Sequence, residues 1–184
     1  MRLADNDKIY SLDEYIKGEW VSELRHEYID GRLFAMPHED CRNNAIRGHI
    51  AFALYNALKG NGYRFFIHDV KVAIPGGNRY YYPDVFATKE KATETNTYIQ
   101  YSPEIIIEVV SESTHSTDYI DKYIDYSKIP SLLYYLIVEP ETMLVTVFEK
   151  DENNNWITHK YTQRDAVIKL PALNVEFLLG QVYE

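Results

Sequence analysis

Residues 103–110 are Pro103-Glu104-Ile105-Ile106-Ile107-Glu108-Val109-Val110, an apolar run that contains a charged residue. A run that is apolar on both faces is typical of a central strand, covered on each side by other elements. An isolated carboxylate costs several kcal/mol to bury unless a partner compensates for its lost hydration. We therefore expect the centre of a sheet here, with the Glu108 carboxylate as part of a site.

A second acidic residue lies in a similar setting, the segment Tyr80-Tyr81-Tyr82-Pro83-Asp84-Val85-Phe86-Ala87. Asp84 precedes Glu108 by 24 positions with a loop between, so the two can lie on neighbouring strands at similar height. Two close carboxylates repel unless a cation separates them. Because oxygen ligands favour magnesium or manganese, the pair predicts metal-assisted chemistry, with a phosphate ester as the expected substrate.

Hydrolysis of a phosphodiester also benefits from a lysine that orients the attacking water. The usual position for it, two residues after the second acid, holds Val110. Lys122 is the replacement candidate, on a helix predicted at 118–128 that also carries Tyr126 on the same face, at i+4. From spacing alone the favoured alternative is a surface ion pair between Lys122 and Asp118.

Glu27 is a further candidate carboxylate, because it lies in a predicted β-hairpin. Glu27-Tyr28-Ile29 and Arg32-Leu33-Phe34 flank Asp30-Gly31, and Asp-Gly between alternating runs is a strong hairpin signal. The alternative, slightly favoured by the pattern alone, is an exposed hairpin residue.

The remaining segments predict a mixed sheet flanked by helices, in the α/β (α+β) class. Ser11-Leu12-Asp13-Glu14 is a capping box for a helix that ends near Gly18, and a second helix is predicted at 44–59, before Gly60. Strands are predicted at 63–67, 70–74, 80–87, 104–110, 132–138, 143–148 and 156–161, with loops at 89–101 and 111–117. Parallel strands on either side of the 118–128 helix would form a crossover unit.

Length and composition favour one globular domain over residues 1–184. The chain is 46% hydrophobic and 26% charged, has a single cysteine, and shows neither an apolar leader nor a run of membrane length. We expect a cytoplasmic protein. The net charge of −9 comes wholly from residues 81–184, while residues 41–80 hold six basic side chains and one acid. Among the basic residues, Arg42, Arg47 and Arg79 are candidates for contacting phosphates.

Other site types find less support. The six histidines lack zinc-like spacing, Gly76-Gly77 lies between strands rather than before a helix, and the chain has no Gly-x-Ser-x-Gly motif. The 17 tyrosines could stack on bases, although such residues more often fill a core edge or an interface.

Several segments match a known family in order along the chain. They are Glu27-Tyr28-Ile29-Asp30-Gly31-Arg32-Leu33, Pro83-Asp84-Val85, residues 103–111, the set Asp118, Lys122 and Tyr126, Ile129-Pro130-Ser131-Leu132, residues 135–140 and Leu170-Pro171-Ala172-Leu173. With them, the chain from about residue 10 to its end resembles the Uma-type bacterial family of proposed restriction endonucleases, in the PD-(D/E)XK nuclease superfamily.

The resemblance implies a restriction-endonuclease-like PD-(D/E)XK core and a magnesium-dependent endonuclease, with manganese as an alternative metal. It implies Asp84 and Glu108 as metal ligands, Lys122 as the catalytic lysine and Glu27 as an accessory acid. It also implies DNA as the partner and a homodimer. Two alternatives remain open: a non-catalytic nucleic-acid-binding or interaction module that retains the fold, and a hydrolase of a small phosphate ester.

Overall fold

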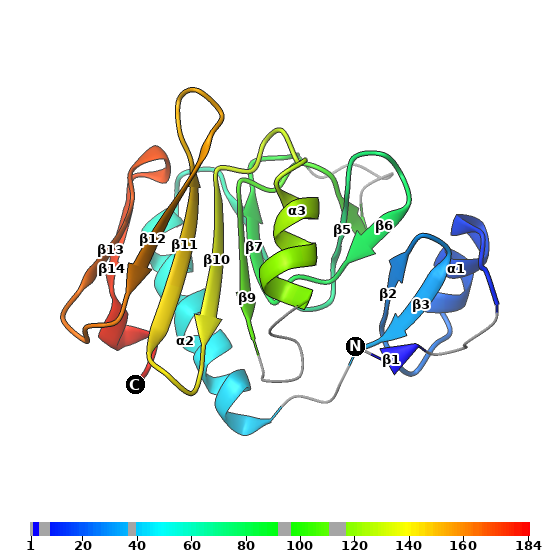
Figure 1. Ribbon diagram of the computed structural model, residues 1–184, viewed down its shortest axis with the longest axis horizontal. Helices are drawn as coiled ribbons and strands as arrows, with labels where there is room; N and C mark the ends of the chain where they lie inside the picture. Colours follow the sequence, from blue (N-terminus) through cyan, green and yellow to red (C-terminus); the bar gives the residue numbers. More distant parts are fainter. Residues whose placement is uncertain (1, 4–7, 37–39, 92–96, 111–116) are drawn as a thin grey trace.

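The centre of the molecule is a mixed β-sheet. The computed structural model describes residues 2–3, 8–36, 40–91, 97–110 and 117–184 (Figure 1). In this part of the chain six strands form the sheet, in the order β12 (Trp156–Tyr161), β11 (Leu144–Lys150), β10 (Tyr134–Glu139), β9 (Ile105–Val109), β7 (Val85–Thr88) and β4 (Arg64–Ile67). Strands β9 and β10 are parallel and the other neighbours are antiparallel. The predicted central strand is therefore central.

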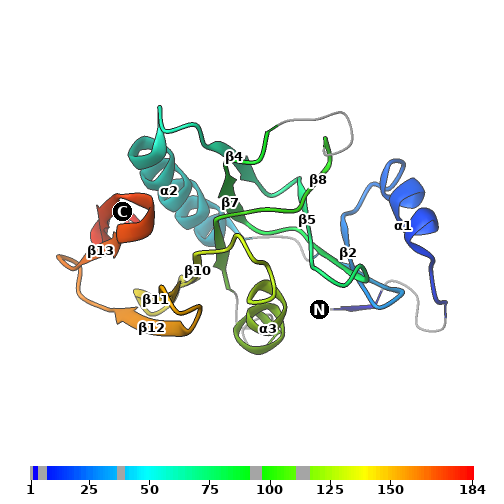
Figure 2. The ribbon, with the colours of Figure 1, turned by 90° about the horizontal axis from the view of Figure 1, so that it is seen from above.

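Helices cover both faces of this sheet, as predicted. Figures 1 and 2 show α2 (Cys41–Leu58) on one face and α3 (Tyr123–Tyr126) on the other. Along β9, Ile105 and Ile107 belong to the core cluster under α2, whereas Ile106 packs in the cluster that contains Tyr126 of α3. Since side chains alternate along a strand, residue 108 faces the α3 side.

A second six-stranded sheet, among the described residues, contains the N-terminal hairpin. Its order is β1 (Arg2–Leu3), β3 (Arg32–Ala35), β2 (His26–Ile29), β6 (Arg79–Tyr81), β5 (Lys71–Ala73) and β8 (Ile99–Gln100). Helix α1 (Leu12–Glu19) packs on it through Tyr15, whose ring stacks on that of Tyr28 at 4.9 Å between centroids. The capping box at Ser11 and the hairpin across Asp30-Gly31 are both present, as predicted.

The segment 80–87 is not one strand, and this prediction was wrong. It divides into β6 and β7, which belong to different sheets, and Tyr82-Pro83-Asp84 connects them. Proline has no N–H to donate to a ladder, so a strand ends or bends where proline lies inside it. The same break brings the two sheets together beside Asp84.

The helix predicted at 118–128 is present, but its first part is not α-helical and its bounds differ. Thr117–Lys122 forms a wide π-helical segment and Tyr123–Tyr126 continues as α3. Residues 111–116 of the predicted turn lie outside the described part of the chain. The predicted loop at 89–101 includes the short strand β8, which pairs with β5.

The C-terminal segment adds a small hairpin beside α2. It consists of β13 (Val167–Leu170), a 3-10 turn (Pro171–Leu173), β14 (Val175–Leu178) and a second 3-10 turn (Leu179–Gln181). Its apolar side chains extend the core cluster of α2. No helix in the described ranges has the length and apolar character needed to cross a bilayer.

An ion-pair network centred on the buried Asp125 fastens α3 to the second sheet. Arg79 of β6 donates to Asp125 of α3 at 2.8 Å and to Asp30 at 2.6 and 3.0 Å, and Tyr81 donates to Asp125 at 2.6 Å. Burial alone would raise the pKa of Asp125. Hydrogen bonds from Lys128, Tyr81 and Arg79 outweigh that effect and hold the pKa below its ordinary value.

We expect Asp125→Ala to lower the free energy of unfolding by about 1–3 kcal/mol, because it leaves the buried Tyr81 hydroxyl without its acceptor and leaves Arg79 with Asp30 as its remaining partner. The folded-state pKa is depressed, so this stabilisation is complete above the unfolded pKa near 4 and is lost as the pH falls through the folded value. Urea unfolding at several pH values measures it, with exposed Asp165→Ala as the control. A pH-independent difference between Asp125→Ala and the wild type would contradict the expectation.

Candidate active site

A buried lysine joins two carboxylates from different sheets. The Nζ atom of Lys122 lies 3.0 Å from Glu108 Oε1 and 3.1 Å from Glu27 Oε1. All three side chains are at most 7% exposed. Glu108 comes from β9 of the central sheet, Glu27 from β2 of the second sheet and Lys122 from the π-helical segment, so the contact ties three separate elements together.

Asp84 completes the acidic set at the junction between β6 and β7. Its Oδ2 accepts a hydrogen bond from the backbone N–H of Val109 at 2.6 Å, which places it beside the residue that follows Glu108. Its Oδ1 pairs with Arg47 of α2 at 2.6 Å. Both side chains are about nine-tenths buried, so each charge depends on the other for compensation.

Tyrosines complete the surroundings of the lysine. Tyr126 donates to Glu108 Oε1 at 2.8 Å, one turn further along the same helix as Lys122. Burial, followed by the nearby Glu108 charge, raises the pKa of Tyr126 well above its ordinary value, so the phenol stays protonated and remains a donor. The ring of Tyr81 lies 5.5 Å from Lys122 Nζ and adds a cation–π contact.

The charges in this group are compatible with a divalent cation. Three carboxylates, Glu27, Asp84 and Glu108, face two cations, Arg47 and Lys122, which leaves one net negative charge among these five residues. Magnesium is commonly held by one or two carboxylates, with water and substrate phosphate as the other ligands. No cluster of three His, Cys, Asp or Glu side chains suited to a metal occurs among the described residues. Asp84 and Glu108 would supply the two carboxylates of such a magnesium site.

His68 supplies a further polar atom beside Asp84. Its Nδ1 is buried, lies 3.9 Å from Asp84 Oδ1 and has no hydrogen-bond partner among the described residues. A buried nitrogen of this kind normally bonds to water or to a ligand. A bound water or ligand beside Asp84 would satisfy this nitrogen.

The structure brings together all four residues that the sequence singled out, Asp84, Glu108, Lys122 and Glu27. Two sequence-based alternatives are wrong, because Glu27 and Lys122 are buried against each other rather than exposed. The side chain of Asp118, the suggested surface partner of Lys122, lies outside the described part of the chain. Val110, at the usual lysine position, packs in the apolar core.

Sequence reasoning missed the role of Arg47, which it treated as a phosphate contact. A signal was available, since Arg47 lies one helical turn before Ala51 and two before Leu54, on the buried face of α2. The other phosphate candidates are also paired within the protein, Arg42 with Glu141 and Arg79 with Asp30 and Asp125. His68 carried no comparable signal, because a lone histidine at a strand end is common.

Fold and site together define a restriction-endonuclease-like α+β protein. A similar solved structure is titled a "putative nuclease belonging to DUF820" from Anabaena variabilis, with a TM-score of 0.76 and 17% identity, covering 94% of this chain and 97% of that one.

The chain belongs to the Uma2 family, described as "Putative restriction endonuclease", whose model matches residues 12–180. Two relatives are uncharacterized proteins of Synechocystis. The protein slr1290 is 26% identical over 94% of this chain and 90% of its own, and sll1609 is 24% identical over 95% and 100%.

Lys122→Met tests the energetic role of the central lysine. Removal of one partner from a buried ion pair costs about 3–5 kcal/mol, because Glu27 and Glu108 would be left close together without their shared cation. Denaturant unfolding in metal-free buffer measures the loss. Lys160→Met, on the exposed face of β12, is the matched control. Equal stability of the two variants would show that Lys122 does not hold the carboxylates together.

Proposed function

We propose that the protein is a magnesium-dependent endonuclease that hydrolyses phosphodiester bonds in DNA. The observation that carries the proposal is the buried convergence of two carboxylates, Asp84 at the β6–β7 connection and Glu108 on β9, with a lysine held beside Glu108. Membership in a family described as restriction endonucleases supports nucleic acid as the substrate.

Asp84 and Glu108 are the residues that would hold the metal ion, with Mg²⁺ preferred and Mn²⁺ as a substitute. When bound there, a divalent ion supplies Lewis-acid activation of water and stabilises the negative charge that builds on the phosphate. Arg47 competes for Asp84 Oδ1, so the metal-loaded site requires this ion pair to loosen or to share the oxygen.

The protein side chains position the reaction. Lys122 carries a fixed ammonium whose hydrogen-bond donors can orient the attacking water and stabilise the negative charge that develops on it. Glu27 fixes Lys122 from the side opposite Glu108, and Tyr126 fixes the Glu108 carboxylate. In the reaction the water oxygen loses one proton and bonds to phosphorus, the bond from phosphorus to the leaving oxygen breaks, and the leaving oxygen takes up one proton, so that one water molecule is consumed.

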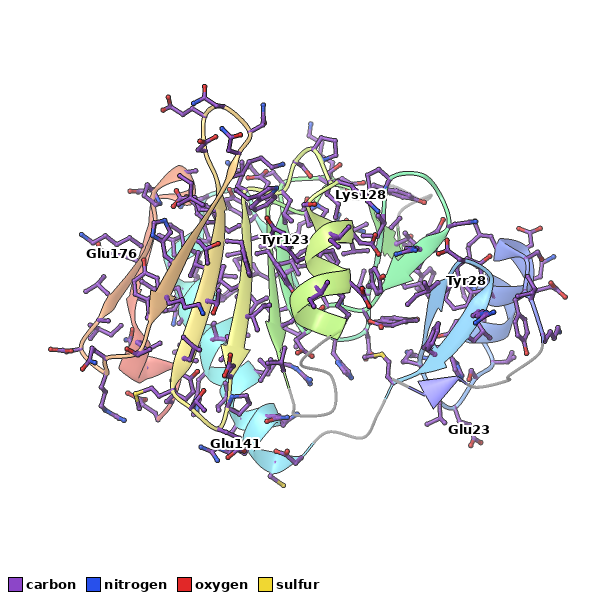
Figure 3. All side chains as sticks on the ribbon, in the orientation of Figure 1. Glu23, Tyr28, Tyr123, Lys128, Glu141 and Glu176 are labelled. Carbon is purple, nitrogen blue, oxygen red and sulfur yellow. The ribbon has the colours of Figure 1, made fainter. Side chains whose placement is uncertain are left out.

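Cleavage of plasmid and of single-stranded DNA in Mg²⁺ or Mn²⁺ tests the proposal. We expect the wild type to cut, and Asp84→Asn, Glu108→Gln and Lys122→Ala each to lower the rate at least about 100-fold, since each removes a group that acts on the transition state. Glu176→Gln is the matched control, because Glu176 is exposed on β14 at the opposite end of the molecule from Tyr28 (Figure 3).

The outcomes separate the open alternatives. Cleavage that survives all three substitutions would falsify the site. A wild type that binds DNA without cutting it, in either metal, would favour the non-catalytic module. Hydrolysis of a simple phosphodiester without any cleavage of DNA would favour the small-substrate hydrolase.

Metal binding itself gives a readout that does not depend on cleavage. A ligand that binds the folded state raises stability by RT ln(1 + [L]/Kd). We expect millimolar Mn²⁺ to raise the thermal midpoint of the wild type and to have little effect on the double variant Asp84→Asn/Glu108→Gln. An equal rise in both proteins would place the metal elsewhere.

A further inference from the structure

A cavity lies between α1 and β8, beside the candidate active site. Its volume is about 580 Å³, within the roughly 300–1,000 Å³ typical of small-ligand sites. Trp20 and Arg25 line it from the N-terminal region, Tyr98 and Tyr101 from the β8 region, and Lys71 and Tyr82 from its interior side. Two carboxylates, those of Glu19 and Asp69, also line it. Figure 2 shows α1 and β8 in the same part of the molecule.

The cation of this cavity is Lys71, which is only 8% exposed. Its Nζ atom lies 5.0 Å from the ring centroid of Tyr82 and 5.6 Å from that of Tyr15, and it has no hydrogen bond or ion pair with any residue in the described ranges. A buried ammonium is costly without an anionic partner. Burial accordingly lowers the pKa of Lys71, although Glu19 partly offsets this effect and Arg25 adds to it. Glu19 lines the same cavity, but its carboxylate accepts hydrogen bonds from Tyr82 and from the backbone N–H of His26. An anion bound in the cavity would supply a direct partner for Lys71.

Arg25 provides a second positive charge at the rim. It pairs with Asp69 at 3.5 Å, and both side chains are well exposed, so this ion pair contributes little and can be exchanged for a phosphate. Arginine also matches the planar, bidentate geometry of phosphate oxygens. The two cations thus offer one deep and one shallow contact for the same anion.

Exposed aromatic rings stand next to these cations. Trp20 is 63% exposed, and Tyr98 and Tyr101 about half exposed, and the ring of Trp20 meets that of Tyr98 edge-on at 4.5 Å. Exposed aromatic rings beside cationic side chains are a usual platform for bases that are not stacked in a duplex. An anion and a flat aromatic group within one ligand match the description of a nucleotide.

Tyr82 connects this cavity to the candidate active site. Its ring lies under Lys71, its hydroxyl donates to Glu19 at 2.9 Å, and its backbone N–H donates to Glu27 Oε1 at 3.4 Å. Glu27 is the carboxylate that pairs with Lys122. Tyr82 therefore lines the cavity and also contacts Glu27 of the candidate active site. Asp84 follows Tyr82 by two positions.

We propose that this cavity binds one unpaired nucleotide of a DNA strand, with the base stacked on the exposed ring of Trp20, which Tyr98 contacts edge-on, and the phosphate held by Lys71 and Arg25. The inference rests on the proposed nuclease function and makes it more specific: the substrate is a single strand, a strand end or a duplex from which a base is extruded. Stacking requires a free base face, so an intact duplex is the poorer ligand.

Tryptophan fluorescence tests the contact directly, because the chain has only Trp20 and Trp156. In a Trp156→Phe variant with EDTA present, we expect a short oligodeoxythymidylate to quench Trp20. Anisotropy with the same labelled strand should show Kd about ten-fold weaker for Trp20→Ala and for Lys71→Met. The controls Phe52→Ala and Lys160→Met, at exposed positions on α2 and β12, should stay within two-fold of the wild type.

Unchanged Kd in Trp20→Ala and Lys71→Met, with no quenching, overturns the inference even if Asp84-dependent cleavage is observed. Trp20 is exposed, so Trp20→Ala leaves the apolar core intact. Its Kd therefore tests the inference even if Lys71→Met is unstable. Binding of thymidine 5′-monophosphate or inorganic phosphate but not of the oligonucleotide also overturns it, in favour of a free-ligand site. Strand binding with these losses but no cleavage by any form supports the cavity and counts against the nuclease.

Discussion

The ion pairs of Lys122 hold the two sheets together at the candidate active site. One ammonium group satisfies a carboxylate from each sheet, so the N-terminal hairpin, the central strand β9 and the helix after it meet at one point. None of these buried charges is tolerable alone, because each would lose its hydration without compensation. The relative placement of the two sheets therefore depends on a contact whose atoms are also those best suited to chemistry.

Strand β9 shows how a core and a site share one segment. Its odd-numbered residues 105, 107 and 109 face α2 and belong wholly to the apolar core, while the even face carries Ile106, then Glu108. Tyr126 continues the apolar packing with its ring and satisfies Glu108 with its hydroxyl. The site is thus an interruption of the apolar face under α3, bounded on one side by the tyrosine rings.

The sequence alone predicted the central strand, the N-terminal hairpin and the acidic residues within apolar segments, and the physical reasons can be named. A charge inside an apolar strand is conspicuous, and so Asp84 and Glu108 were found, as was the hairpin marked by Asp30-Gly31. The break at Pro83 was missed, because an apolar run on both sides of a proline resembles one strand. The partners of Lys122 and Arg47 could not be read, since a long side chain does not reveal in sequence which of several carboxylates it reaches. Those pairings exist only once the two sheets are in place.

Lys122 lies on a helix instead of on the strand that bears Glu108, so the candidate site assembles only when these elements pack together. An acid and a lysine on one strand are neighbours as soon as that strand forms. Here residues 27, 108 and 122 come from three segments that are distant in the chain, and they meet only in the completed tertiary structure. A partly unfolded chain therefore carries all the residues of the candidate site but no assembled centre, and a chain synthesised only as far as β9 still lacks Lys122. Any activity of these residues is latent until folding is finished.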